Sequence, residues 1–244
     1  CLTRPGYPLD LSNEIDPQKI PPLNIFDGIS YIRNLQPSRK ELRFIDYVPA
    51  AADSIERQLI EYSPQFVIAA SNYIVAIPVL IACRRLRIPF FYEVRGFWEI
   101  TRLSRDPSYI NNPSYSVQRI LESTVCKNAE NVFTLTDSMK AEILSRGSNG
   151  KSVTIVPNSC NPELFKPKPK NTDLLSTLNI DVGTTVIGYI GTFVDYEGLE
   201  LLAEACTLLS RDGLKFKLLL VGNENVSGKE IGPIGQNIRN IVNL

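Results

Sequence analysis

Residues 186–202 read VIGYIGTFVDYEGLELL, and the hydrophobic period changes within them. An apolar, β-branched run ends at Gly191, a polar turn follows, and apolar residues recur at helical spacing after Gly198. This pattern predicts a strand, a tight turn and the N-terminus of a helix. Such a terminus offers free backbone N–H groups and the positive end of the helix dipole, so we interpret the turn as a candidate phosphate site.

Strands and helices alternate on both sides of this stretch. The expected strands are 65–70, 90–94, 131–135 and 152–156, followed by strands that begin near Thr185 and Phe216. The expected helices are 73–86, 115–128 and 138–146. Strands separated by helices of this length form parallel β-α-β units. Residues 1–50 are rich in proline and are expected to be mainly loops, and residues 223–244 are expected to be loop and strand.

An alternating Lys/Pro stretch at 166–171 interrupts the pattern. It cannot form a helix or a central strand, so it is typical of a semi-rigid connector. We therefore expect an α/β protein of two Rossmann-like domains, each with its own parallel sheet. About 70 residues follow the connector, which is few for a complete doubly wound sheet. The chain also opens at Cys1 as if at the end of a strand, so we expect both domains to be incomplete and the chain to be a fragment.

The composition is that of a soluble globular protein. Hydrophobic residues make up 43% of the 244 residues, and 26 basic residues balance 26 acidic ones, so no positive excess points to nucleic acid. Five cysteines without a CxxC pair predict free thiols in a reducing compartment, and no apolar run approaches the ~20 residues of a membrane span. Because histidine is absent, a His-ligated metal and a Ser-His-Asp triad are excluded within this chain. We expect a cytoplasmic protein without a metal.

Three segments, taken in order, carry a resemblance to a known family. They are VTIVPNS at 153–159, the stretch at 186–202, and FKLLLVG at 216–222. Together they resemble the nucleotide-sugar half of the family 4 glycosyltransferases, which are retaining enzymes of the GT-B fold. The resemblance implies an N-terminal acceptor-side domain at 1–165, a linker leading into the second domain at 166–184, and the start of a C-terminal nucleotide-sugar-binding domain at 185–244.

The resemblance also implies a function. A family 4 enzyme transfers a sugar from a nucleotide diphosphate sugar to a saccharide or lipid-linked acceptor with retention, as in polysaccharide biosynthesis. No cofactor is implied, and typically no metal, because backbone N–H groups and side chains neutralise the leaving diphosphate. A lipid-linked acceptor implies peripheral association with the inner face of the membrane. The cluster Arg84-Arg85-Leu86-Arg87 suits such a surface, and the alternative is the solvated end of a helix.

The donor-binding residues implied by the resemblance are Gly191, Thr192, Glu197 and Gly198. Family members carry an Arg after the first glycine and a Lys before the second, where this chain has Thr192 and Glu197. A carboxylate ~4 Å from a phosphate charge is unfavourable by roughly 4 kcal/mol at intermediate dielectric. Either Glu197 turns away from the phosphate, or the donor is held mainly by backbone N–H groups and by residues not present in this stretch. The alternative is that Glu197 only complements the helix dipole. Asn158, in a Pro-Asn-Ser that resembles the family's Pro-Asn-Gly, is a further donor-side candidate, and a plain turn is the alternative.

The acceptor-side candidates follow the strand at 90–94. Family members often carry a His-Asp pair here, and that pair falls on Arg95 and Gly96. Arg95 is the candidate catalytic residue, and Gly96 and Trp98 are assigned to the acceptor side. An arginine stays charged, so it suits a phosphate or carboxylate and cannot act as a base. The alternative is that Arg95 pairs with Glu93 or Glu99 and that Trp98 covers the core.

Two other functions stay open. One is a nucleotide-sugar epimerase of the same fold, and the other is a non-catalytic nucleotide-binding module, consistent with the missing family residues. Glu122 and Glu130 match the spacing of the family's paired donor-site glutamates, but they lie in the first domain, so we interpret the match as chance. The genuine pair is expected beyond Leu244, and the Gly-rich first turn before Cys1. We therefore expect the 244-residue stretch alone to be inactive.

Overall fold

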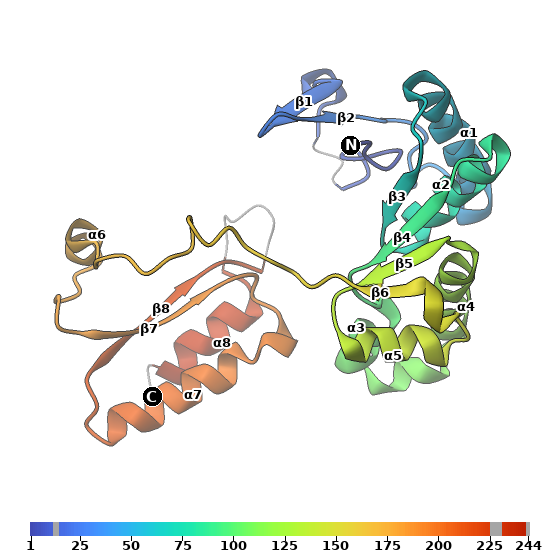
Figure 1. The fold of residues 1–244 in the computed structure, drawn as a ribbon. Coiled ribbons are helices and arrows are strands. Elements are labelled where there is room, and N and C mark those ends of the chain that lie inside the picture. Colours follow the sequence, from blue (N-terminus) through green and yellow to red (C-terminus); the bar gives the residue numbers. More distant parts are fainter. Residues whose placement is uncertain (12–14, 225–230, 243–244) are drawn as a thin grey trace. The chain divides into compact units, whose positions relative to one another are not determined.

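The computed structural model describes residues 1–11, 15–224 and 231–242 (Figure 1). These residues form two compact units, Cys1–Ser159 and Cys160–Leu244. Unit 1 contains a four-stranded parallel sheet and unit 2 a separate two-stranded parallel sheet. The expectation of an α/β protein with two separate parallel sheets is therefore confirmed.

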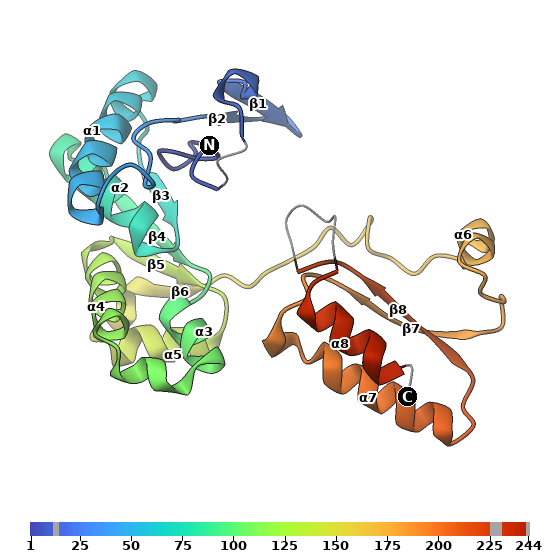
Figure 2. The ribbon, with the colours of Figure 1, turned by 180° about the vertical axis from the view of Figure 1, so that it is seen from behind.

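The sheet of unit 1 is formed by β3 (Val67–Ala70), β4 (Phe90–Val94), β5 (Asn131–Thr134) and β6 (Val153–Ile155). The strands pair in this order, with Val67 opposite Phe90, Phe91 opposite Asn131, and Val132 opposite Val153. Along the chain, the strands are connected by α2 (Tyr73–Leu86), α3 (Trp98–Arg105), the 3₁₀ helix η2 (Pro107–Asn111), α4 (Pro113–Asn128) and α5 (Asp137–Ser145) (Figure 2). Each element expected between residues 65 and 156 is present, and its bounds differ by no more than about two residues.

β4 supplies the centre of the core of unit 1. Phe90, Tyr92 and Val94 are buried, and the two residues between them are half-buried on the opposite face. The buried face packs against side chains from four helices, among them Leu59, Leu80, Val125 and Ile143. On the opposite face the Phe91 ring stacks on Phe133 at 6.1 Å between centroids. This alternation is what a strand covered by helices on one face produces.

The first fifty residues contain more regular structure than expected. β1 (Leu23–Phe26) and β2 (Ile29–Ile32) form an antiparallel hairpin, and Asp27 and Gly28 turn it with positive φ angles. Asp-Gly is a favoured two-residue hairpin turn because both positions must adopt positive φ. The expectation of loops is also wrong for residues 44–50, which begin α1 (Phe44–Tyr62), a helix with Pro49 in its second turn. Its stability comes from packing on α2 through fully buried alanines, Ala51 and Ala52.

Unit 2 contains the strand, turn and helix expected at 186–202. β7 (Thr185–Ile190) leads through the 3₁₀ turn η4 (Asp195–Glu197) into α7 (Leu199–Arg211), and β8 (Phe216–Val221) returns parallel to β7. A short helix, α6 (Thr172–Thr177), precedes β7. The apolar face of α7 buries Leu199 and Ala203 together with Ile238.

The last part of the chain corrects another expectation. Residues 223–244 were expected to be loop and strand, but α8 (Pro233–Val242) is a helix. Pro233 occupies its first position, where proline is favoured. Ile234, Ile238 and Ile241 then recur at helical spacing and contact the core of unit 2. Residues 225–230 and 243–244 lie outside the described residues.

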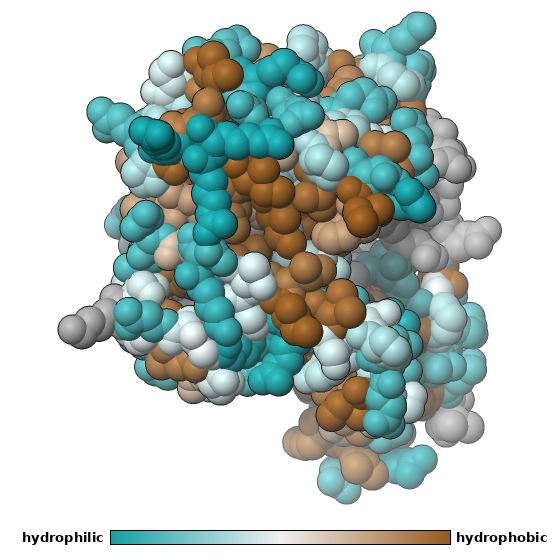
Figure 3. All heavy atoms as spheres, turned by 90° about the vertical axis from the view of Figure 1, so that its right-hand side faces the viewer, coloured by the Kyte–Doolittle hydropathy of each residue, from teal (hydrophilic) through white to brown (hydrophobic). Residues whose placement is uncertain are grey.

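Apolar side chains also gather on the surface. Figure 3 shows one face of the molecule, on which apolar side chains lie together among hydrophilic ones. In unit 1, α1 and α4 carry exposed apolar side chains, including Ile45, Ile60, Val117 and Ile120. Extended apolar patches on a protein surface mark binding surfaces for proteins, membranes or ligands.

A close backbone contact joins the ends of β7 and β8 in unit 2, and it generates a prediction. A Cβ atom added to Gly222 would lie 1.8 Å from the Gly191 carbonyl oxygen, so Gly222→Ala must force the two strand ends apart. We expect it to destabilise unit 2 by about 3 kcal/mol or more. Gly188→Ala, with nothing within 4 Å of the added atom, is the matched control. Hydrogen exchange of β7 and β8 measures both variants, and unchanged protection in Gly222→Ala would contradict the prediction.

Candidate functional site

The turn that joins β7 to α7 is fixed by backbone hydrogen bonds to β8 and the residues after it. The Gly191 N–H donates to the Val221 carbonyl at 3.0 Å, and the Phe193 N–H donates to the Asn223 carbonyl at 3.2 Å. The Tyr189 hydroxyl donates to the Thr192 carbonyl at 2.8 Å. These bonds hold the backbone of 191–193 in place without using the first N–H groups of α7.

The N-terminus of α7 has no side-chain cap. Its N-cap residue is Gly198, which adopts a left-handed conformation with φ 70°. The first N–H donation of the helix is from Leu202 to the Gly198 carbonyl, at 3.0 Å. The N–H groups of the three residues between them, 199–201, have no acceptor within the helix. They point along the positive end of the dipole, which is the arrangement that binds a phosphate.

The side chains around this terminus are acidic. Asp195, Glu197 and Glu200 lie within one turn of the start of α7, and Glu197 is exposed. The Asn237 amide donates to the Glu200 carboxylate at 2.8 Å, which holds that side chain against α8. The three carboxylates complement the helix dipole. Thr192 and Glu197 are both exposed, and because one is uncharged and the other acidic, neither supplies a positive charge to a bound anion.

The segment after β4 carries the acceptor-side candidates. The Arg95 guanidinium pairs with Glu93 at 2.7 Å, and the Arg95 N–H donates to the Ser71 hydroxyl at 3.1 Å. The hydrogen bond to Glu93 raises the pKa of Arg95, so this side chain stays charged. Of the pairings considered for Arg95, the structure contains the one with Glu93. Trp98 does not cover the core, since it is 58% exposed and Phe97 is buried instead.

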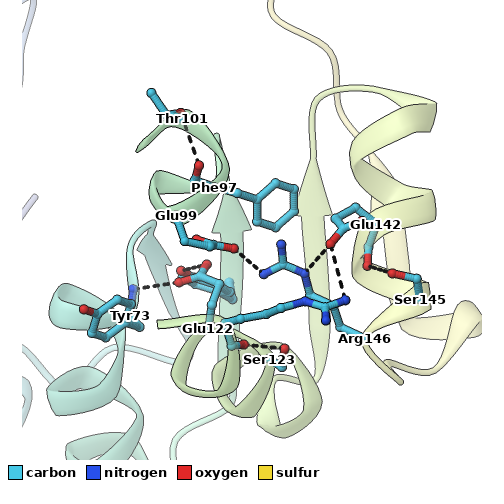
Figure 4. Close-up of polar contacts among 11 residues, drawn as sticks. Tyr73, Phe97, Glu99, Thr101, Glu122, Ser123, Glu142, Ser145 and Arg146 are labelled. Carbon is cyan, nitrogen blue, oxygen red and sulfur yellow. Dashed lines mark hydrogen bonds and ion pairs between the residues drawn. The ribbon is translucent and has the colours of Figure 1, made fainter. Parts of the chain in front are cut away.

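A buried ion pair anchors this segment from below (Figure 4). The Arg146 guanidinium contacts Glu99 at 2.7 Å and donates to Glu142 at 2.8 Å, and the side chains of Arg146 and Glu99 are each 3% exposed. The same guanidinium lies 4.2 Å from the centre of the Phe97 ring. The end of α5 therefore fixes the start of α3, and with it the backbone that presents Arg95, Gly96 and Trp98.

The Glu122 carboxylate is held inside unit 1 by hydrogen bonds. It is buried and accepts a hydrogen bond from the Tyr73 N–H at 2.9 Å (Figure 4). It accepts another from the Tyr92 hydroxyl. Burial raises the pKa of its carboxyl above the ordinary value, and the two hydrogen bonds and Arg146 oppose this shift. Glu130, its partner in the family-like spacing, is exposed.

The structure gathers the candidate residues into two groups. Gly191, Thr192, Glu197 and Gly198 share one turn of unit 2. Arg95, Gly96 and Trp98 share the segment after β4 in unit 1, and Asn158 is exposed after β6. Because β4 and β6 are parallel, Arg95 and Asn158 follow the same edge of their sheet.

Sequence reasoning missed two contributors to the segment after β4. Ser71, which accepts from the Arg95 N–H, directly follows β3 at the same sheet edge. A polar residue after a predicted strand was the available signal. The Glu99–Arg146 pair had no local signal, since its two members come from different helical segments.

The arrangement of parallel sheets and helices defines an α/β protein of the GT-B class. A sucrose-phosphate synthase from Thermosynechococcus elongatus has a similar fold, with a TM-score of 0.69 at 16% identity over 99% of this chain and 56% of the other. Anabaena HepE in complex with UDP and glucose has a TM-score of 0.63 at 12% identity, over 87% of this chain and 52% of the other. A UDP-GlcNAc 2-epimerase from Neisseria meningitidis has a TM-score of 0.50 at 15% identity, over 86% of this chain and 54% of the other. The chain therefore spans about half the length of these proteins.

The family model named glycosyl transferase 4-like domain matches residues 15–159. The match covers more than half of the chain, so the chain belongs to this family. No curated protein sequence matches it. Among the described residues, no helix is long and apolar enough to cross a membrane, and no three His, Cys, Asp or Glu side chains form a group suited to a metal ion.

The raised pKa of Glu122 predicts a pH dependence of stability. The folded chain holds this proton more tightly than the unfolded chain, so stability falls as pH rises from the ordinary glutamate pKa of about 4.3 through the folded pKa. Gln at this position keeps an acceptor for the Tyr73 N–H, so we expect Glu122→Gln to remove this fall and to be at least as stable at pH 8. Urea unfolding across this pH range measures the free energy of unfolding of each variant, and Glu130→Gln is the matched control. An equal fall in stability in Glu122→Gln and in the wild type would show that Glu122 does not cause the pH dependence.

Proposed function

We propose that the protein is a glycosyltransferase that transfers a sugar from a nucleotide diphosphate sugar to a saccharide or lipid-linked acceptor with retention. The observation that carries the proposal is the uncapped N-terminus of α7 after β7, in a chain whose residues 15–159 belong to the glycosyl transferase 4-like family. Solved proteins of similar fold include one bound to UDP and glucose, which supports a nucleotide-sugar donor.

In this proposal the diphosphate binds at the start of α7. The N–H groups of residues 199–201 receive the phosphate oxygens and stabilise the charge that develops on the leaving diphosphate, with no metal or cofactor required. Gly198 allows the phosphate to approach the backbone, because a Cβ atom added there would meet only Leu201, at 3.9 Å, and Gly191 begins the turn. Thr192 and Glu197 border the site, and Asn158 stays a donor-side candidate at the sheet edge of unit 1.

Arg95 and Trp98 act on the acceptor side. Arg95 is fixed by Glu93 and remains charged, so its role is electrostatic and it removes no proton. Gly96 leaves open space beside it, because a Cβ atom added there would meet nothing within 4 Å. The exposed apolar side chains of α1 and α4 support peripheral association with the cytoplasmic face of a membrane, as a lipid-linked acceptor in polysaccharide biosynthesis would require.

A nucleotide-sugar epimerase is the second candidate, because a UDP-GlcNAc 2-epimerase also shares the fold. The two functions differ in their products. A transferase releases free UDP only when an acceptor is present, whereas an epimerase interconverts the donor without an acceptor. A non-catalytic module would bind UDP and turn over nothing in either assay.

Binding of UDP by calorimetry tests the phosphate site. Leu201→Pro removes one of the three free N–H groups within the first helical turn, where proline is tolerated. Leu201→Ala is the matched control, since Leu201 is 69% exposed and its N–H is kept. A lost hydrogen bond to a charged group costs about 1.5–3 kcal/mol, so we expect Leu201→Pro to weaken UDP binding roughly tenfold to a hundredfold. Equal affinity in the two variants, both still folded, would place the phosphate elsewhere.

The acidic side chain before Gly198 gives a second prediction. Replacing Glu197 by Lys turns a repulsion of the diphosphate into an attraction, so we expect Glu197→Lys to tighten UDP binding by about tenfold at low salt and less at high salt. Asp212→Lys makes the same charge change at the far end of α7 and is the control. If both variants bind UDP alike, Glu197 does not face the phosphate.

A further inference from the structure

A hollow in unit 1 combines an exposed indole with two guanidinium groups. It has a volume of about 580 Å³ and is lined by Trp98, Thr101, Arg102, Arg105 and Asp106. All but Thr101 are charged or aromatic, and each of the five residues is exposed. The hollow lies on α3, the helix that directly follows Arg95 and Gly96. Small-molecule sites combine aromatic surface with placed polar groups, and this hollow has both, with polar groups in the majority.

Arg102 is held in one orientation. Its guanidinium lies 4.2 Å from the centre of the Tyr109 ring, and Tyr109 is itself buried. The Tyr109 hydroxyl accepts a hydrogen bond from the Gln118 amide at 3.1 Å, and its ring packs edge-on against Tyr115. A guanidinium stacked on a fixed ring keeps its N–H groups directed outward in the plane. Such a fork matches the oxygens of a phosphate or a carboxylate.

The charge of the hollow is positive. Arg102 and Arg105 contribute two positive charges, and Asp106 contributes one negative charge. The Asp106 carboxylate accepts hydrogen bonds from the Ser108 N–H at 3.0 Å and from the Ser108 hydroxyl at 2.6 Å. Asp106 is therefore engaged in starting η2, and the net attraction for an anion remains.

Trp98 presents an exposed apolar face. It is the only tryptophan of the chain, and its neighbour Glu99 is locked by the buried pair with Arg146. One face of a pyranose ring consists of C–H groups and packs flat on an indole, which buries apolar area on both partners. The indole of Trp98 therefore suits the ring of a sugar, and the two guanidinium groups suit a charged substituent on it.

We propose that this hollow binds an anionic saccharide, with the sugar ring on Trp98 and a phosphate or carboxylate substituent on Arg102 and Arg105. Its role as the acceptor site rests on the proposed glycosyltransferase function. In that case the acceptor carries a negative charge, which distinguishes it from neutral sugars.

Trp98 reports directly on its own site, because all tryptophan fluorescence of the chain comes from it. We expect glucose 6-phosphate to change the emission saturably, and added NaCl to weaken the effect. Arg102→Gln and Arg105→Gln should each weaken binding about tenfold. Arg102→Lys, which keeps the charge but loses the planar fork, should fall between them and the wild type. Arg57→Gln/Arg239→Gln removes two exposed arginines outside the hollow and should leave binding unchanged.

Comparing glucose 6-phosphate with other ligands tests each part of the proposal separately. A response to glucose as strong as to glucose 6-phosphate would overturn the requirement for charge. An equal response to inorganic phosphate would overturn the role of the sugar ring, and a stronger arginine-dependent response to UDP would reassign the hollow to a nucleotide. Unaltered binding in folded Arg102→Gln and Arg105→Gln would also overturn the proposal. Calorimetry with UDP and the Leu201 variants reports on α7 separately, so the donor-site proposal and this one can fail independently.

Discussion

Parallel strand pairing is the constraint on which the candidate sites depend. Each parallel neighbour must be reached by a crossover, so every strand of β3-β4-β5-β6 ends at the same edge of the sheet. The residues that follow these strands are polar and gather there, including Ser71 after β3, Arg95 after β4 and Asn158 after β6. In unit 2 the same pairing brings Gly222 against the Gly191 carbonyl oxygen, so closely that Gly222 has no room for a side chain.

The start of α7 has two opposing electrostatic properties. Its free N–H groups and dipole favour an anion, whereas Asp195, Glu197 and Glu200 place negative charge beside them. The carboxylates stabilise the helix when no anion is bound, since a negative charge near a helix N-terminus contributes about 0.3–1 kcal/mol. In the proposed complex, a diphosphate would take over that role and would meet their repulsion. Binding to such a site depends on directed hydrogen bonds rather than on net charge, and a Lys in place of Glu197 would reverse that balance.

The elements that could be predicted are those with a long, regular period. The β-α-β units between residues 65 and 156 and the strand–turn–helix at 186–202 follow directly from hydrophobic spacing. The hairpin was missed although Asp27-Gly28 is a strong turn signal, and α1 was missed because Pro49 masked a helix stabilised by packing. Side-chain partners were harder to predict. The pattern offered Glu93 and Glu99 as partners of Arg95, and only the fold shows that Glu99 is committed to Arg146.

The pairing of Glu99 with Arg146 explains why, in the segment after β4, Phe97 is buried and Trp98 is exposed. Removing Arg146 and Glu99 from water is costly, and a buried ion pair is often no more stabilising than apolar residues of the same size. Its effect here is positional, because Arg146 reaches both the Glu99 carboxylate and the face of the Phe97 ring. With Phe97 held inward and Glu99 held against α5, the residue between them projects away from the core. Trp98 is therefore exposed as a consequence of its neighbours' burial, and α3 then places Arg102 one turn further along, next to the same indole.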